Sequence, residues 1–321
     1  MGCTIIGCGK QLPALDVPNE ELTKLVDTTD EWISTRTGIL SRRVCVTESN
    51  VDMAEGAARQ ALGWADGGYS QCKVAPEDID LVIYSTISPD EMVPTCAAVL
   101  RRRLGLVNAA AFDMNAACTG FIYGLTIAES MMAASAPGAA GAAGRNPIRR
   151  ALVVGGERLT RVVDWADRNT CVLFGDGAGA AVVEWDERKP GILSWFIKND
   201  DDHTNALTCP ACFDAPQPFT PEGVNPNALQ QADPSIALID AELDTTERIA
   251  AGAPRQVLSM HGQKVFKFAT SVMPAAIEEV LRRANLTIDD VQFIVPHQAN
   301  LRIIKYAAKR MGLPLERFQV S

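Results

Sequence analysis

A cysteine at a strand–helix junction is the residue with the clearest chemical potential in this sequence. Residues 109–114 have the pattern of a buried strand, and a run of small residues leads from it to Cys118, which opens a predicted helix. The positive end of a helix dipole favours the thiolate and lowers a thiol pKa. Because α/β enzymes place reacting groups at the carboxyl ends of strands, we predict that Cys118 is a nucleophile. A small buried thiol that only fills space is the alternative.

A histidine follows a second predicted strand and is a natural partner for this thiol. His297 comes after the strand expected at 291–295 and before the helix expected at 301–311. An imidazole can move a proton or donate a hydrogen bond to a developing negative charge. A lone histidine is more often structural. Here the Cys118 and His297 segments belong to two similar units, so we expect the two side chains to face each other across a pseudo-twofold axis.

An aromatic and a basic residue form a third candidate site near the start of the chain. Trp32 and Arg36 are four residues apart and share one face of a helix, which Thr28 and Glu31 would begin as a capping box and Gly38 would end. An indole beside a guanidinium can stack on a nucleobase and pair with phosphate. A packed tryptophan beside a solvated arginine fits the same spacing.

Charge is concentrated in one segment near the end of the chain. Residues 296–312 contain four basic side chains and no acidic one: Arg302, Lys305, Lys309 and Arg310. On an acidic protein such a helix is either a docking face for an anionic partner or an ordinary solvated face.

Two further motifs do not support the sites that they suggest. The glycine-rich run at 175–180 superficially fits a dinucleotide fingerprint, but it leads into a predicted strand and not a helix. Cys209 and Cys212, with His203 nearby, lack a second pair of ligands at zinc spacing. We therefore expect neither a dinucleotide site nor a metal.

Composition limits the classes of protein to consider. The 321 residues include 39 acidic and 30 basic side chains, a formal net charge of −9 that argues against a general nucleic-acid binder. No apolar run is long enough to span a membrane, and the first residues lack the basic region of a signal peptide. An odd count of nine cysteines at irregular spacing is typical of reduced thiols. We expect a cytoplasmic protein without nucleic-acid or membrane partners.

The elements that position these residues have the alternating pattern of an α/β protein. The predicted strands lie at 4–7, 81–85, 109–114, 151–155 and 178–185, and the further helices at 52–62, 95–104, 119–134 and 271–284.

The two parts of the chain also resemble each other. Residues 77–83 match 289–295, each an acidic turn before a strand, and the basic pair and glycine at 102–106 recur at 309–313. We interpret this as an internal duplication, with halves at 1–188 and 189–321 and an insertion at 199–255. The second half is expected to be cut short.

Together these motifs resemble the β-ketoacyl-[acyl-carrier-protein] synthase III family, the priming condensing enzymes of type II fatty acid synthesis. The resemblance covers almost all of the chain outside 136–146 and 199–255. It rests on residues 29–39, 115–121, 167–168, 174–181, 261–269 and 295–304. It implies a thiolase-like fold of two pseudo-duplicated α/β halves, each with a five-stranded mixed sheet between helices, assembled as a homodimer.

The resemblance also implies a reaction. Cys118 would accept an acyl group from acyl-coenzyme A (acyl-CoA), and malonyl-acyl carrier protein (malonyl-ACP) would then condense with it in a decarboxylative Claisen step that gives 3-oxoacyl-ACP. His297 would assist decarboxylation as a neutral imidazole. The third catalytic residue of the family, an asparagine, is expected beyond Ser321. No metal or redox cofactor is implied.

The binding residues implied by the resemblance form three groups. Coenzyme A (CoA) would contact Trp32, Arg36, Arg168, Gly262, Phe266, Asn300 and Arg302. The acidic carrier protein would dock on Lys267, Arg302, Lys309 and Arg310. The acyl pocket would involve Phe174 and, from the partner subunit of the dimer, Val93, whose small side chain would admit longer or branched acyl groups.

Two alternatives stay open. A starter synthase of polyketide or quinolone type would share the cysteine and histidine. A non-catalytic, truncated relic that binds carrier protein would lack the asparagine, and the same expected truncation puts the activity of this chain in doubt. An elongating condensing enzyme fits less well, because it receives its primer from carrier protein and would not need the pair at Trp32 and Arg36.

Overall fold

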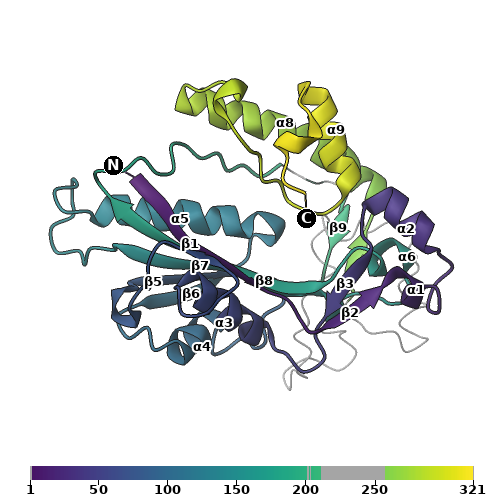
Figure 1. Ribbon diagram of the computed structural model, residues 1–321, viewed down its shortest axis with the longest axis horizontal. Helices are drawn as coiled ribbons and strands as arrows, with labels where there is room; N and C mark the ends of the chain where they lie inside the picture. The colour runs from purple at the N-terminus through teal and green to yellow at the C-terminus, as the bar shows by residue number, and fades with distance from the viewer. Residues whose placement is uncertain (1, 201, 203, 211–256, 321) are drawn as a thin grey trace, which may run out of the picture.

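The computed structural model describes residues 2–200, 202, 204–210 and 257–320. Most of the insertion expected at 199–255, including Cys212 and His203, therefore lies outside the described residues. A sheet with helices on both faces makes up the larger part of the structure, and the last two helices lie together outside it (Figure 1). Among the described residues, none of the helices combines the length and apolar character needed to cross a bilayer.

The main sheet contains the five predicted strands of the first half. They are β1 (Gly2–Gln11), β5 (Leu81–Ser85), β6 (Ala110–Met114), β7 (Arg150–Arg158) and β8 (Asp176–Asp186), with the two-residue strand β4 (Tyr69–Ser70) added at one edge. Their order is β4-β1-β8-β7-β5-β6. Strand β5 runs parallel to β6 and β7, while β8 is antiparallel to β7 and β1, so the sheet is mixed as expected.

Helices cover both faces of this sheet. Helices α3 (Asn50–Ala61) and α4 (Cys96–Arg103) pack on one face and α5 (Gly120–Ser135) on the other (Figure 1). All five residues of β5 are buried, because helices cover the strand on both sides. This double coverage explains why its sequence is a continuous apolar run, and it makes β5 the centre of the core.

A smaller unit at the side of the sheet carries the predicted aromatic–basic helix. It consists of α1 (Asn19–Leu22), α2 (Asp30–Thr37), α6 (Arg168–Cys171) and the antiparallel pair β2 (Leu15–Pro18) and β3 (Ser41–Val44). The expected capping box at Thr28 and Glu31 is wrong. Thr29 caps α2 by accepting a hydrogen bond from the N–H of Trp32 at 3.0 Å. A capping box needs a glutamate or glutamine at this third position of the helix, and Trp32 cannot serve as one.

The second half contributes two long helices. Helix α9 (Leu301–Met311) has the predicted bounds, whereas α8 (Gly262–Ala284) begins nine residues before the expected start at 271 and contains Pro274. The short strands β9 (Leu207–Thr208) and β10 (Ser259–Met260) pair with each other before α8.

The strand expected at 291–295 is not formed. Ile294 makes one parallel bridge to Phe318, and Val295 is 79% exposed. A strand depends on its neighbours for backbone hydrogen bonds, and within the described residues this segment has only that bridge. The five-stranded second sheet is correspondingly absent from the part of the chain that the structure describes.

Local features of the proposed duplication recur. A 3₁₀ turn lies at the start of each compared segment, at Pro76–Asp78 and Ile288–Asp290. Helices α4 and α9 are each followed by a left-handed glycine, Gly105 with φ 68° and Gly312 with φ 67°. The division into halves at residue 188 stays a prediction.

Candidate active site

The turn that holds Cys118 joins the edge strand β6 to helix α5. Cys118 is the middle residue of a 3₁₀ turn, Ala117–Thr119, directly before Gly120 starts the helix. Ala117 has a φ of 45°, a left-handed conformation that a residue with a side chain rarely adopts and that costs about 1–3 kcal/mol. The surrounding fold therefore holds an unfavourable backbone that presents the exposed Cys118 side chain.

Close packing under this turn sets its position. A Cβ atom at Gly120 would overlap with the hydroxyl oxygen of Ser85, the last residue of β5. Only a glycine lets α5 approach the end of β5 so closely. The thiol consequently lies at the carboxyl ends of two parallel strands, as the sequence predicted.

The expected lowering of the Cys118 pKa is wrong. Although part of the Cys118 side chain is exposed, the protein atoms around its sulfur desolvate the thiolate, and this raises the pKa of Cys118 above its usual value of 9.0. A hydrogen bond from its own backbone N–H lowers the pKa, and the charge of Glu157 raises it, but desolvation is the largest of the three effects.

His297 lies in the extended segment between the Ile294 bridge and helix α9. Desolvation lowers the pKa of His297 below its usual 6.5, which keeps the imidazole neutral at neutral pH. A neutral imidazole can donate one N–H hydrogen bond without adding a positive charge. Its pairing with Cys118 stays a prediction.

A groove of about 720 Å³ lies next to α2, α6, α8 and α9. It is lined by all seven residues predicted to contact CoA, which are Trp32, Arg36, Arg168, Gly262, Phe266, Asn300 and Arg302. The other lining residues are Thr37, Asn169, Val172, Leu173, Met260, His261, Gln263, Val265, Ala299 and Ile303. Three of these residues are arginines and none is acidic, so the groove is suited to an anionic ligand.

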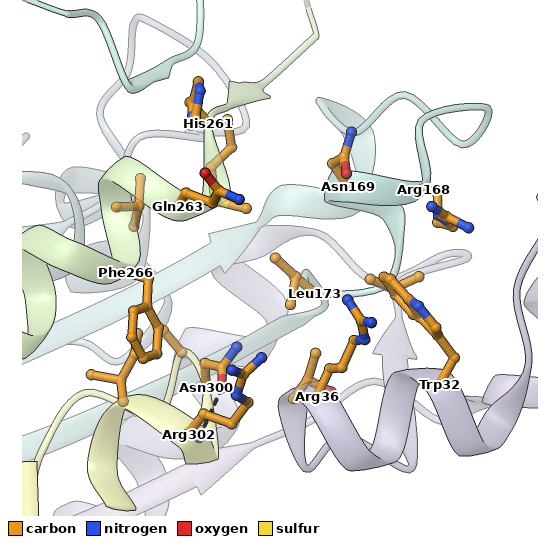
Figure 2. A pocket seen from close by; sticks show the side chains of 17 residues that line it. Trp32, Arg36, Arg168, Asn169, Leu173, His261, Gln263, Phe266, Asn300 and Arg302 are labelled. Carbon is orange, nitrogen blue, oxygen red and sulfur yellow. Dashed lines mark hydrogen bonds between the residues drawn. The ribbon is translucent and has the colours of Figure 1, made fainter. Parts of the chain in front are cut away.

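Helices from distant parts of the sequence converge on this groove (Figure 2). Helix α2 supplies Trp32 and Arg36, and its approach to α9 depends on Gly38, where a Cβ atom would lie 2.7 Å from the Cβ of Leu301. Gly38 has a φ of 82°, so it both ends α2 and admits the next helix.

Two guanidinium groups flank the indole of Trp32. The Cζ atom of Arg36 is 4.7 Å from the ring centroid and that of Arg168 is 4.8 Å away. The four-residue spacing predicted the first contact, whereas only the fold brings Arg168 to the same ring. Arg168 is held by a hydrogen bond from its Nη1 to the carbonyl oxygen of Asp27 at 2.9 Å. The aromatic surface and the two cations match a base and its phosphates.

The opposite wall begins at the N-terminus of α9. The side-chain oxygen of Asn300 caps α9 by accepting a hydrogen bond from the N–H of Arg302 at 2.8 Å, which leaves the amide NH₂ as the donor for a ligand (Figure 2). The guanidinium of Arg302 lies 5.6 Å from the ring centroid of Phe266, which also contacts Tyr306 edge to face.

Sequence reasoning missed several polar residues of the groove. Asn169 follows Arg168 at the start of α6, and Gln263 follows Gly262 at the start of α8. Each of them is adjacent in sequence to a predicted groove residue, and this adjacency could have identified them. His261 also lines the groove; it belongs to the segment 261–269 on which the family resemblance rests, but it was not among the predicted site residues.

The predicted carrier-docking side chains lie on the exposed sides of two helices. Lys267 is exposed on α8, and Arg302, Lys309 and Arg310 are exposed on α9. Helix α9 is strongly two-sided, because its opposite face buries Ile303, Ile304, Ala307 and Ala308. Arg302 belongs to both the groove and this basic face.

The two predicted acyl-pocket residues lie in different environments. Val93 is 83% exposed in the loop before α4. Phe174 is half-buried and packs against the cluster that contains Ile33 and Cys171. Neither residue lines the groove at Trp32. A shared acyl pocket formed with Val93 of a second copy stays a prediction.

Two sequence expectations concern motifs outside the groove. The glycine-rich run at 175–180 does not open a helix, as expected: its residues 176–180 form the first part of strand β8. Within residues 2–200, 202, 204–210 and 257–320, no group of three or more His, Cys, Asp or Glu side chains is arranged to hold a metal ion.

Comparisons with known proteins identify the family of this chain. The model of 3-oxoacyl-[acyl-carrier-protein (ACP)] synthase III matches residues 112–201, and the model of its C-terminal part matches residues 281–321. The β-ketoacyl-[acyl-carrier-protein] synthase III of Clostridium acetobutylicum is 38% identical over 317 residues, which are 99% of this chain and 83% of that protein.

Solved structures agree with this result. The β-ketoacyl-[acyl carrier protein] synthase III of Thermus thermophilus is 35% identical with a TM-score of 0.76, covering 99% of this chain and 84% of that one. The priming β-ketosynthase of the R1128 polyketide pathway is 34% identical with a TM-score of 0.73, covering 100% and 81%. These folds confirm the predicted thiolase-like class.

Proposed function

The chain belongs to the 3-oxoacyl-[acyl-carrier-protein] synthase III family, and from this premise we propose that Cys118 accepts the acyl group of an acyl-CoA held in the groove at Trp32. As a member of this family it is an acyltransferase that condenses an acyl-CoA primer with malonyl-ACP. The product is 3-oxoacyl-ACP, and the step initiates type II fatty acid synthesis. The reaction needs no cofactor beyond its thioester substrates.

The observation that carries the proposal is the pair of guanidinium groups around Trp32. An adenine ring stacks on an indole, and arginine pairs with phosphate in a two-pronged geometry. Arg36 and Arg168 stand within 4.7 and 4.8 Å of the ring centroid, in a groove whose described lining contains no acid. These features support binding of the nucleotide end of CoA at Trp32, with Asn300 and Phe266 along the pantetheine.

The first half-reaction transfers the acyl group to Cys118. The thiolate attacks the thioester carbonyl carbon, a tetrahedral oxyanion forms, and the C–S bond to CoA breaks with departure of the CoA thiolate. The backbone N–H of Cys118 would donate to the oxyanion. The left-handed Ala117 supports this role, because it turns the backbone at the residue before the nucleophile.

The second half-reaction forms the new carbon–carbon bond. Malonyl-ACP loses carbon dioxide, and the electron pair of the broken C–C bond forms a thioester enolate. The enolate carbon attacks the acyl group and releases the Cys118 thiolate. His297 would donate an N–H hydrogen bond to the enolate oxygen, and its lowered pKa supports the neutral form that this role requires.

The carrier protein would dock on the basic face formed by Lys267, Arg302, Lys309 and Arg310. Exposure of all four side chains beside the groove supports this proposal. An acidic partner would be attracted and oriented there, and its pantetheine arm could enter past Arg302.

We also propose that the chain acts as a cytoplasmic homodimer. Strand β6 is the last strand of the main sheet, so its outer edge is available for pairing with a second copy. Val93 would then reach the partner's acyl pocket, and its small side chain would admit primers longer than acetyl. All eight described cysteines are free, which supports a reducing compartment. Sedimentation equilibrium that gives a monomer would contradict the dimer.

A second candidate function is the priming of polyketide synthesis. It is favoured by the 34% identity to the R1128 priming β-ketosynthase. Assays with carrier proteins from the two kinds of pathway would distinguish these functions, because each enzyme should prefer its own carrier.

Labelling with radioactive acetyl-CoA and longer acyl-CoA primers tests the proposal. We expect covalent label on Cys118, located by peptide mass spectrometry, and at least about a 10⁴-fold loss of transfer in Cys118→Ala. Cys72→Ala serves as the matched control, because Cys72 is another exposed free thiol. Label on any other residue, or none, would contradict the assignment.

A further inference from the structure

The loop between β5 and α4 has firmly held ends and an exposed middle. Its tip, residues 91–94, is exposed throughout, and Val93 is 83% exposed. On either side of this tip the loop is hydrogen-bonded to half-buried carboxylates, Glu157 before it and Asp113 after it. A loop that protrudes from two such anchors is held in one position although its tip has little packing of its own.

Glu157 holds the first end. One carboxylate oxygen accepts a hydrogen bond from the N–H of Ile87 at 2.8 Å. The other accepts from the N–H of Ser88 at 3.1 Å, from the hydroxyl of Thr86 at 3.2 Å, and from the hydroxyl of Ser88. Four donors from three consecutive residues converge on a single side chain. An ionised carboxylate satisfies such a set, because it only accepts hydrogen bonds.

The same end is tied to the core by Asn50. Its NH₂ group donates to the hydroxyl of Thr86 at 3.0 Å and to the carbonyl oxygens of Ser88 and Gly156 at 3.1 and 3.0 Å. Asp90 in turn accepts from the N–H of Asn50 at 2.9 Å. The loop is therefore joined to the start of α3 and to the end of β7 before its tip begins.

Asp113 holds the second end and links it to the nucleophile. Its two carboxylate oxygens accept from the N–H groups of Cys96 and Ala97 at 2.9 and 2.7 Å, at the start of α4. Asp113 lies in β6, the strand that leads directly to Cys118. The anchor of the loop and the turn of the nucleophile thus belong to one continuous stretch of backbone.

From these contacts we propose that Glu157 and Asp113 are positioning residues that set acyl-chain selectivity. By fixing both ends of the loop they hold Val93 at a defined depth in the acyl pocket of a second copy of the chain. A fixed tip rejects primers beyond a certain length, whereas a loosened tip yields to them. The inference rests on the proposed function, because it assumes that Cys118 takes acyl groups from acyl-CoA.

The test compares Cys118 acylation by acetyl-CoA and by octanoyl-CoA in wild type and in Glu157→Gln. Glutamine keeps the shape but turns an NH₂ toward the Ser88 N–H, which cannot accept a hydrogen bond. We expect the rate of acylation by acetyl-CoA divided by that by octanoyl-CoA to fall about tenfold in Glu157→Gln, which favours the longer primer. Asp113→Asn should change the ratio only about threefold, because each Asp113 oxygen accepts a single N–H, whereas the Glu157 oxygen that faces Ser88 accepts three hydrogen bonds.

Glu184→Gln is the matched control, since Glu184 is also half-buried on the main sheet but pairs with Arg150, away from the loop. It should leave the ratio unchanged. Amide hydrogen exchange measures directly how firmly Glu157 holds the first end of the loop. The amides of Ile87 and Ser88 should exchange at least about tenfold faster in Glu157→Gln.

The outcomes separate the two ideas. If wild type acylates Cys118 and Glu157→Gln changes the acylation rates with both primers by the same factor, Glu157 does not set selectivity and the inference is wrong. If Glu157→Gln does not fold, an unchanged ratio in Asp113→Asn overturns the inference in the same way. Wild-type protein that leaves Cys118 unlabelled with every primer would instead contradict the proposed function, on which the selectivity role depends.

Discussion

The turn at Cys118 and the groove at Trp32 are built in opposite ways. The turn is fixed by backbone conformation and by one close contact, at Ala117 and between Gly120 and Ser85. The groove is formed by long side chains, such as Arg168 and Arg302, that reach it from different helices. The difference indicates that chemistry depends on the placement of single atoms, whereas binding is shared among several contacts. Damage to the turn should therefore be severe, and damage to the groove gradual.

Gly120→Ala is the strongest test of this contrast. The added Cβ would overlap with Ser85, so we expect a cost of about 3 kcal/mol in folding free energy. Acylation of Cys118 should fall about 100-fold in the protein that folds, because α5 must shift away from β5. Urea denaturation and single-turnover acylation measure the two effects.

Gly105→Ala is the control for this substitution. Gly105 has a positive φ but nothing within 4 Å of an added Cβ, so only the backbone cost of about 1 kcal/mol applies. Equal effects of the two substitutions would show that close packing under Cys118 does not matter.

The pH dependence should differ between Cys118 and His297. Because the Cys118 pKa is raised, the thiolate is a minor form at neutral pH, and the acylation rate should rise about tenfold per pH unit below that pKa. Because the His297 pKa is lowered, the imidazole stays neutral at neutral pH, and malonyl-ACP decarboxylation should decline only in acid, below the usual imidazole pKa of 6.5.

Rapid-quench acylation and carbon dioxide release measure the two profiles separately. An acylation rate that is already constant near neutral pH would contradict the raised pKa of Cys118. Decarboxylation that falls between about pH 8 and pH 7 would contradict a neutral His297.

In the groove, single losses should be moderate and confined to binding. Trp32→Ala and Arg168→Ala should each raise the KM for acetyl-CoA about tenfold and leave kcat unchanged, because each removes one of several contacts to the nucleotide. Acetyl-pantetheine lacks the nucleotide, so wild type and variants should use it equally well. Arg145→Ala, an exposed arginine on a distant loop, is the control. A loss of kcat with acetyl-pantetheine would contradict the separation of groove and turn.

The smallest effect is expected on the basic face. Lys309→Ala should raise the KM for malonyl-ACP about threefold without changing that for acyl-CoA, because one exposed charge adds little to a docking surface. Arg102→Ala is the matched control, since Arg102 holds the corresponding place in the first repeat. Equal effects of the two substitutions on malonyl-ACP would indicate that net charge and not docking at α9 matters.

Elements with a strong local signal could be predicted from the sequence. Strand β5 and helix α9 have the predicted bounds, because an apolar run and a helical repeat are written in consecutive residues. The contact between Trp32 and Arg36 followed from their spacing on one helix. The resemblance to a known family supplied the other five predicted CoA residues, which no local pattern connects, but not Asn169 or Gln263.

Properties that depend on distant neighbours could not be predicted in this way. Residues 291–295 have the composition of a strand but only one bridge among the described residues, since a ladder requires partner strands. The sign of the Cys118 pKa shift was wrong because desolvation depends on packing that the local motif does not contain.

The sequence alone therefore determined the order of elements, the nucleophile candidate at Cys118 and the family to which the chain belongs. The tertiary structure decided that Arg168 meets Trp32, that Gly120 packs against Ser85, and that Glu157 holds the loop before Val93. The physical reason is the separation in sequence between the residues that interact. Periodicity and spacing act between residues close in the chain, whereas burial, electrostatics and close packing are set by residues that only folding brings together.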